Sequence, residues 1–322
     1  MGLIDLSNDV FSFPPTGMRE RIAQAEVLPG IYAEDASAAA LESKLAALLG
    51  MESALYFLTG TAANLVAHMT HCQPGDEVIC GEFAHTFNLE AGGAQRVAGL
   101  SVRTVAQEGA RLDPEQVARS IRSGEVTQPR SALLWIDQPS RGFVLGVAEL
   151  CELAELAWSR GLKIHVDGAR LFEAAIALDV PVTDLTRWCD SVMVSFTKGL
   201  CAPMGAALVG SADFIERARR NRKVIGAEVR HSAFMAAAGV YALDHMVPRL
   251  ADDRQNARRL AGAFAGLPHL RIDREDVQTN RFVLIVDEPL DPVALAASLR
   301  RRGVFVNPPK PPGRGVNIVT HY

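Results

Sequence analysis

The 322-residue sequence has few of the features that mark membrane, secreted or nucleic-acid-binding proteins. No stretch of about 18 uninterrupted apolar residues occurs, so no membrane span or membrane partner is expected. The five cysteines are scattered, with neither Cys-x-x-Cys nor zinc-site spacing, which predicts free thiols and no metal site. Lys and Arg number 33 against 37 Asp and Glu, so no basic excess indicates a nucleic-acid partner. The first residues show no signal-peptide pattern, and the predicted location is the cytoplasm.

Apolar strand patterns alternate with helical patterns through most of the chain. Continuous apolar strands separated by helices predict an α/β fold with a mostly parallel sheet that helices cover on both faces. The segment 232–265 predicts one long helix, and 270–320 predicts a smaller α+β unit. We therefore expect an N-terminal arm (1–30), a large domain (31–240) and a small C-terminal domain (241–322). The strands of the large sheet are expected at 53–58, 77–81, 101–106, 131–137, 163–167, 191–197 and 205–211.

Two charged side chains stand where apolar strands end. In "SVMVSFTKGLCAPMGAAL" (191–208), Lys198 follows a strand pattern and precedes several small residues that leave room for a bulky group. In "HVDGAR" (165–170), Asp167 ends another apolar strand. Buried charges are costly unless they are paired or used chemically, and ligands of α/β folds bind at the carboxyl ends of strands. Lys198 could also be a surface turn residue, and Asp167 could simply pair with Arg170.

Two further features stand at strand exits. "LTGTAAN" (58–64) predicts a strand, then Thr59, Gly60 and Thr61, then a helix whose first N–H groups could bind a phosphate; a simple capped helix start is the alternative. His85 follows the strand at 77–81 and could stack on a flat ring, although a lone histidine is usually structural.

Pyridoxal phosphate requires these four elements together. It needs a lysine for covalent attachment, a carboxylate for its pyridine nitrogen, a phosphate cradle and a flat partner for its ring. The sequence supplies them in the order cradle, stacking residue, Asp167, Lys198. Pyridoxal 5'-phosphate is therefore the predicted cofactor.

Long stretches of the chain resemble the L-threonine aldolase group of the β-eliminating lyases, which are fold-type I (aspartate aminotransferase-like) pyridoxal-phosphate enzymes with a seven-stranded type of sheet. The resemblance implies that Lys198 binds the cofactor covalently, Asp167 contacts the pyridine nitrogen, His85 stacks on the ring, and Gly60 and Thr61 hold the phosphate. It implies Arg170 for the substrate carboxylate. The stretches include 30–64, 73–94, "IHVDGARLFEAAIALDV" (164–180), "DSVMVSFTKGLCAPMGAALVGS" (190–211), 222–243 and "NIVTH" (317–321).

The resemblance also implies a homo-oligomer. Lys223 and Arg230 would lie near the phosphate of a neighbouring subunit, so a homodimer or homotetramer with shared active sites is expected.

Departures from the family pattern lie on the substrate side. Asn8, in "DLSND" (5–9), stands where the family has a carboxylate-binding serine, and Asn317 stands where it has a carboxylate-binding arginine. Arg314 could partly replace that arginine. The loop "IDQPSRG" (136–142) lacks the histidine that serves the β-hydroxyl in the family. The altered residues predict a non-standard substrate or a changed reaction.

The resemblance implies a lyase that cleaves the Cα–Cβ bond of a β-hydroxy-α-amino acid to glycine and an aldehyde. The same cofactor could instead support β-elimination, racemisation or transamination. A catalytically weak ligand-binding homologue is a third possibility, although Lys198 and Asp167 together argue against it.

Overall fold

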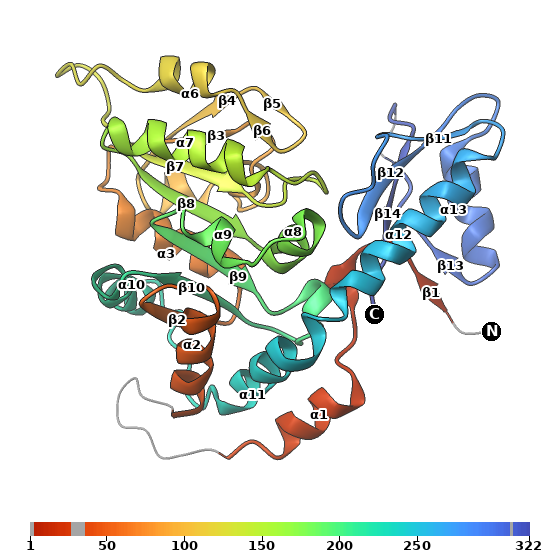
Figure 1. Ribbon diagram of the computed structural model, residues 1–322, viewed down its shortest axis with the longest axis horizontal. Helices are drawn as coiled ribbons and strands as arrows, with labels where there is room; N and C mark the ends of the chain where they lie inside the picture. Colours follow the sequence, from red (N-terminus) through yellow and green to blue (C-terminus); the bar gives the residue numbers. More distant parts are fainter. Residues whose placement is uncertain (1–2, 27–35, 310–311) are drawn as a thin grey trace.

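The large part of the chain is built around a seven-stranded sheet with the order β2-β10-β9-β8-β7-β3-β4 (Figure 1). The computed structural model describes residues 3–26, 36–309 and 312–322. Strand β10 is antiparallel to both its neighbours, and the other neighbouring pairs are parallel. The strands are β2 (Ser53–Phe57), β3 (Glu77–Gly81), β4 (Ser101–Val105), β7 (Ser131–Asp137), β8 (Lys163–Gly168), β9 (Ser191–Ser195) and β10 (Ala206–Gly210).

Helices cover both faces of this sheet, as its continuous apolar strands require. Strand β7 shows why: Leu134 and Ile136 pack into the hydrophobic core on one face, and Leu133 and Trp135 pack into the core on the other. The first core includes side chains from α2 (Ala36–Leu48), α7 (Val147–Ser159), α8 (Leu171–Leu178) and α11 (Ala233–Tyr241), and the second from α3 (Gly60–His71) and α10 (Ala212–Val224).

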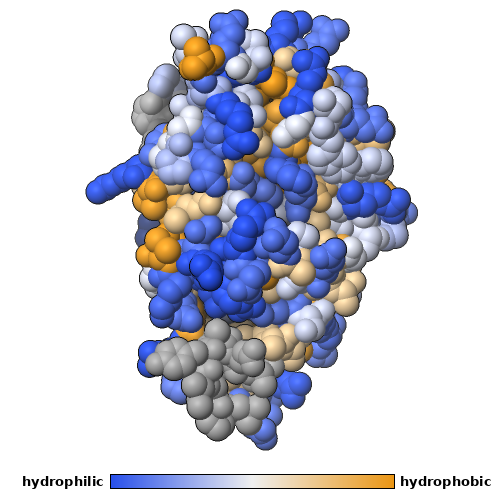
Figure 2. All heavy atoms as spheres, turned by 90° about the vertical axis from the view of Figure 1, so that its left-hand side faces the viewer, coloured by the Kyte–Doolittle hydropathy of each residue, from blue (hydrophilic) through white to orange (hydrophobic). Residues whose placement is uncertain are grey.

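Short elements complete the large part of the chain. They are α4 (His85–Asn88), α5 (Gly93–Arg96), the hairpin of β5 (Gln107–Glu108) and β6 (Arg111–Leu112), α6 (Pro114–Ser120), α9 (Thr183–Thr186) and the 3-10 turn η2 (Lys198–Leu200). Figure 2 views this part from the side of α10, where small hydrophobic patches lie among mostly hydrophilic side chains.

The C-terminal part forms a small antiparallel sheet with helices. Its strands are β11 (Leu270–Ile272), β12 (Arg281–Val286) and β14 (Gly315–Val319), and its helices are α12 (Leu250–Ala265) and α13 (Pro292–Arg301). Helix α12 contacts α8 of the large part and β11 and β12 of the small one, so it links the two (Figure 1).

The N-terminal segment contacts both parts. Strand β1 (Ile4–Asp5) pairs in parallel with β13 (Val304–Phe305) of the small part. The 3-10 turn η1 (Asp9–Phe11) then contacts η2, and α1 (Thr16–Ala23) packs on α11. This path brings Asp9 to the junction between the large and small parts.

The predicted long helix at 232–265 is wrong. The chain instead forms α11, a π-helical turn η3 (Ala242–Met246) and α12. Pro248 lies in the break, where it lacks the N–H that a continuous helix would use. None of the helices in the described ranges has the length and apolar character needed to cross a membrane.

Candidate active site

A cavity of about 260 Å³ opens at the carboxyl ends of the central strands, where α/β folds bind ligands. Residues that follow β2, β3, β7, β8 and β9 line it, and Arg281 of β12 reaches it from the small part. The cavity therefore lies between the two parts of the chain. Six predicted site residues line it: Gly60, Thr61, His85, Asp167, Arg170 and Lys198.

Lys198 is held in an unusual backbone conformation directly after β9. Its φ of 60° lies in the left-handed region, which is uncommon for residues other than glycine and often marks functional sites. The following Gly199 is needed for space, because a Cβ there would lie 2.6 Å from Leu250 Cδ2 and 2.7 Å from Glu173 Oε1. Burial, together with the charge of Arg170, lowers the pKa of Lys198. A lower pKa increases the fraction of free amine, which is the nucleophilic form.

Asp167 is 4% exposed and is held on both carboxylate oxygens. Oδ2 accepts a hydrogen bond from Asn64 Nδ2 (2.8 Å), and Oδ1 accepts one from the N–H of Ala169 (3.1 Å). The same Asn64 Nδ2 donates to Glu90 Oε1 at 2.7 Å. One amide group thus joins two buried carboxylates, which indicates that a cationic group belongs beside them.

His85 is the third member of this cluster. Its Nδ1 lies 2.8 Å from Glu90 Oε1, and this hydrogen bond raises the pKa of His85 despite partial burial. Its backbone N–H donates to Asp137 Oδ2 at 2.8 Å. Burial and the neighbouring charge of Asp167 raise the pKa of Asp137 to about 8, so Asp137 is largely protonated at neutral pH.

The predicted phosphate cradle is the start of helix α3. Gly60 and Thr61 are its first residues and line the cavity. Thr59 has a different use: its Oγ1 accepts a hydrogen bond from the N–H of Ala62 (3.2 Å) and caps the helix. Helix N-termini carry unpaired N–H groups and a partial positive charge, so the start of α3, where Gly60 and Thr61 line the cavity, has the polarity that favours an anion.

Lys223 and Arg230 do not line the cavity of their own chain. The segment between them, residues 224–229, lines an adjacent groove of about 670 Å³ together with Thr59 and Thr61. Lys223 forms an ion pair with Glu228, and its side chain is 69% exposed. A role for either residue at a phosphate stays a prediction.

Of the residues predicted on the substrate side, Arg170 lines the cavity, and Asn8 and Arg314 do not. Arg170 donates from Nε and Nη2 to the two carboxylate oxygens of Asp9, at 2.7 and 2.5 Å. Asn8 accepts from the N–H of Val10 (3.2 Å) and caps η1, and it is not part of the cavity wall. Arg314 donates to backbone oxygens of Val286 and Leu290 and does not line the cavity either.

Asn317 lies outside the wall as well, but it contacts a residue that the sequence analysis missed. Its Oδ1 accepts a hydrogen bond from Nε of Arg281 at 2.7 Å, and Arg281 lines the cavity. Arg141, from the loop after β7, lines it too. Arg281 begins the apolar segment "RFVLIVD" (281–287), which does not indicate the face that it occupies, and only the pairing of β12 with β14 brings it to Asn317.

Comparison with known proteins shows the family of this chain and the same fold. A sequence model of the family Beta-eliminating lyase matches residues 5–287. The low specificity L-threonine aldolase of Escherichia coli K12 is 36% identical over 99% of this chain and 94% of its own length. Low-specificity L-threonine aldolase 1 of Arabidopsis thaliana is 35% identical over 95% of this chain and 88% of its own length. The chain belongs to the β-eliminating lyase family.

Solved structures show the same fold at lower identity. A putative L-allo-threonine aldolase from Listeria monocytogenes superposes with a TM-score of 0.85, at 22% identity over 99% of this chain and 90% of its own. Leishmania major threonine aldolase gives a TM-score of 0.83, at 20% identity over 99% and 94%. The predicted fold class, that of the fold-type I pyridoxal-phosphate enzymes with a mostly parallel sheet and a smaller α+β part, is confirmed.

Proposed function

We propose that the protein is a pyridoxal-phosphate-dependent lyase that cleaves the Cα–Cβ bond of a β-hydroxy-α-amino acid to glycine and an aldehyde. One observation carries this proposal: Lys198, in the turn after β9, and Asp167, in the neighbouring strand β8, line one cavity together with the N-terminus of α3. The threonine aldolases among the relatives support this reaction.

The charges around the cavity suit this cofactor. His85, Glu90 and Asp167 bring their ligand atoms within 4.8 Å of one another. A protonated pyridine nitrogen would supply a cation beside Asp167, and Asp167 would hold the proton there. The N–H groups at Gly60 and Thr61 would bind the phosphate, and Lys198 would hold the cofactor covalently.

Bound pyridoxal phosphate would supply an electron sink for the electron pair of the broken Cα–Cβ bond. The chain itself has to move the proton of the substrate β-hydroxyl. His85 suits this step because Glu90 fixes its Nδ1, while Nε2 has no hydrogen-bond partner among the described residues. A base whose pKa is raised towards neutral pH accepts such a proton most efficiently. His85 Nε2 thus serves as the base that the loop 136–142 does not provide.

The experiment incubates the cofactor-loaded protein with L-threonine and L-allo-threonine. Glycine is measured by amino-acid analysis, acetaldehyde by its enzymatic reduction, and 2-oxobutanoate by chromatography. Cleavage gives equal amounts of glycine and acetaldehyde. Formation of 2-oxobutanoate without glycine would contradict the proposal and indicate β-elimination.

The matched variant is Lys198→Ala. Borohydride reduction of the loaded wild-type protein, followed by peptide mass spectrometry, should locate a pyridoxyl group on Lys198, and the variant should carry none. Persistent cofactor attachment in Lys198→Ala, or undiminished glycine formation, would refute the role given to this lysine.

The proposed enzyme functions in the cytoplasm as a homo-oligomer with shared active sites. The apolar groove between Thr59 and the segment 224–229 lies next to the phosphate cradle, and a second copy of the chain would cover it. Since Arg230 does not line the cavity of its own chain, its proposed contact with the phosphate requires a partner subunit.

Light scattering measures the assembly, and mixing tests the shared site. Lys198→Ala and Arg230→Ala proteins, each inactive alone, should recover activity after subunit exchange because one site of the mixed pair keeps both residues. An active monomer, or no recovery in proven mixed oligomers, would contradict shared sites.

A further inference from the structure

The cavity carries more positive charge on its substrate side than one carboxylate can balance. Three arginines line it: Arg141, Arg170 and Arg281. Arg170 is balanced by Asp9 through two hydrogen bonds. Glu173 lies 3.7 Å from Arg170, but burial raises the pKa of this glutamate to about 8, so it adds little negative charge. Within the described ranges, neither Arg141 nor Arg281 forms an ion pair.

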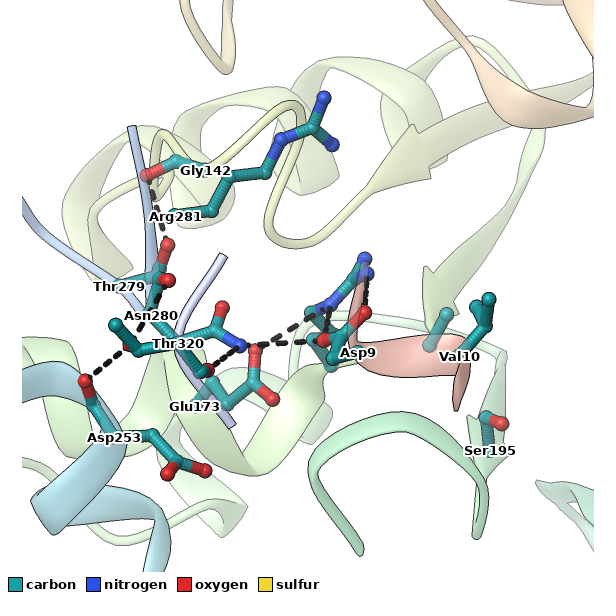
Figure 3. A network of polar contacts seen from close by, with 12 residues as sticks. Asp9, Val10, Gly142, Glu173, Ser195, Asp253, Thr279, Asn280, Arg281 and Thr320 are labelled. Carbon is teal, nitrogen blue, oxygen red and sulfur yellow. Dashed lines mark hydrogen bonds and ion pairs between the residues drawn. The ribbon is translucent and has the colours of Figure 1, made fainter. Parts of the chain in front are cut away.

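One side of the Arg281 guanidinium is held by a hydrogen bond, and the other side is free. Asn317 Oδ1 accepts from Nε at 2.7 Å, which leaves both Nη groups without a hydrogen-bond partner among the described residues. Figure 3 shows the guanidinium of Arg281 extending away from Thr279, Asn280 and the network around Asp9. Burial, together with the charges of Arg170 and Arg141, lowers the pKa of Arg281 to about 10, so it stays charged at neutral pH. A half-buried guanidinium with a free fork is suited to bind a carboxylate through both nitrogens.

Arg141 is anchored at the exposed side of the same cavity. Its guanidinium carbon lies 4.4 Å from the centre of the Phe83 ring, a cation–π contact that leaves its N–H groups free. Phe83 also lines the cavity. The ring holds the guanidinium in place without neutralising its charge.

The acids of the cavity do not balance these two arginines. Asp167 and Glu90 are bound by Asn64, and Asp137 accepts from the N–H of His85. These contacts assign all three to the cofactor side. The acids of the cavity thus leave Arg281 and Arg141 free to bind negative charges that a substrate brings.

We infer that the preferred substrate is a β-hydroxy-α-amino acid with a second acidic group at the end of its side chain. Arg281, the more buried of the two and next to Arg170, binds the α-carboxylate. Arg141, at the exposed side, binds the side-chain acid. This inference rests on the proposed lyase function and names the substrate class of that same site.

The binding test uses amino acids that the proposed reaction cannot cleave. L-Aspartate and L-asparagine have nearly the same size and lack a β-hydroxyl, so calorimetric titration of the cofactor-loaded protein measures binding alone. A charge-assisted hydrogen bond predicts a dissociation constant about 10- to 100-fold lower for aspartate. Equal dissociation constants would overturn the inference, whether or not threonine is cleaved.

Three variants assign the two arginines. Arg141→Gln should remove the preference for aspartate over asparagine, and Arg281→Met should weaken both ligands alike, with partial recovery in Arg281→Lys. Arg271→Met is the control, because it removes the same charge from an exposed residue of β11 that pairs with Asp287. Loss of the preference in Arg271→Met as well would overturn the assignment, since a general charge effect would then explain it.

Turnover separates this inference from the proposed function. The kcat/KM for β-hydroxyaspartate, which would give glycine and glyoxylate, should exceed that for threonine by a similar factor. If threonine is cleaved as efficiently as β-hydroxyaspartate, the result supports the lyase function and contradicts the inferred substrate class. If neither substrate is cleaved while aspartate still binds more tightly than asparagine, the result contradicts the lyase function and supports the acid-binding site.

Discussion

Replacing Asp9 by asparagine should destabilise the fold strongly, because this carboxylate is buried at the junction of three chain segments. Asp9 is fully buried in η1, and its partner Arg170 comes just before α8. Asn280, next to β12, donates a further hydrogen bond from Nδ2 to Asp9 Oδ2 at 3.2 Å. Figure 3 shows these contacts meeting at the Asp9 carboxylate. Burial alone would raise the pKa of Asp9, but the charge and hydrogen bonds of Arg170 hold it well below its usual range.

The magnitude follows from what remains when the charge is removed. Asp9→Asn keeps the size of the side chain, but its Nδ2 cannot accept one of the two hydrogen bonds from Arg170, and the Arg170 guanidinium loses its anion. Removing one partner of a buried ion pair lowers the free energy of unfolding by about 3–5 kcal/mol. We therefore expect the free energy of unfolding to fall by about that amount, which is a large share of the stability of a typical domain.

Urea unfolding, followed by circular dichroism, measures the change. Asp5→Asn is the matched control, because Asp5 is less buried and its Oδ1 accepts only from the N–H of Ser7 (2.8 Å). That control should cost less than about 1 kcal/mol. Replacing both Asp9 and Arg170 by leucine should recover part of the loss, since no unpaired charge then remains. If Asp9→Asn costs no more than Asp5→Asn, the reasoning on this ion pair is refuted.

Three further predictions concern the cavity and the core. Asp167→Asn should reduce both cofactor affinity and kcat by about 100-fold or more, because a neutral amide cannot hold the ring proton; near-normal kcat would mean that Asp167 only binds Asn64. Burial lowers the pKa of His68 to about 3, so the stability from this neutral ring is present above about pH 6.5 and is lost as the pH falls. His68→Gln should thus reduce the pH slope of the unfolding free energy between pH 5 and 6 by about 1.4 kcal/mol per pH unit, and an unchanged slope would contradict the buried neutral state. Gly199→Ala should destabilise by about 1–3 kcal/mol through overpacking, whereas Gly262→Ala, with open space in α12, should stabilise by up to about 1 kcal/mol; equal effects of the two in urea unfolding would refute the crowding at Gly199.

That several candidate site residues meet in one cavity could be predicted from the sequence, because parallel strands end at the same edge of the sheet. Asp167 lies near the end of β8, Lys198 and His85 follow β9 and β3, and Gly60 begins the helix after β2. Parallel strands end at one edge of the sheet, so residues far apart in the sequence meet there without any knowledge of side-chain contacts. The network through Asn64 and its neighbours was not predictable, since it depends on rotamers set by packing.

Helix boundaries in the C-terminal half were less predictable. The apolar pattern of 232–265 suits one long helix, but the chain turns at η3 and Pro248 before α12 leads to the small part. Local patterns report which residues favour a helix, whereas the turn depends on packing between the two parts. Pro248 is the local sequence signal that indicates where the helix breaks.

The substrate side shows why single motif positions mislead. Asn317 indicates a missing cation when β14 is considered alone, yet β12 pairs with β14 and places Arg281 against the Asn317 side chain. A guanidinium can reach one point in space from either of two neighbouring antiparallel strands, because diagonal cross-strand neighbours such as Arg281 and Asn317 lie about 7–8 Å apart, within reach of a long side chain. The two residues are separated by 36 positions in the sequence, so only the register of the sheet joins them. In the proposed function the charge at the cavity wall selects the substrate, and Arg281 and Arg141 make that wall more positive than the asparagine at position 317 would predict.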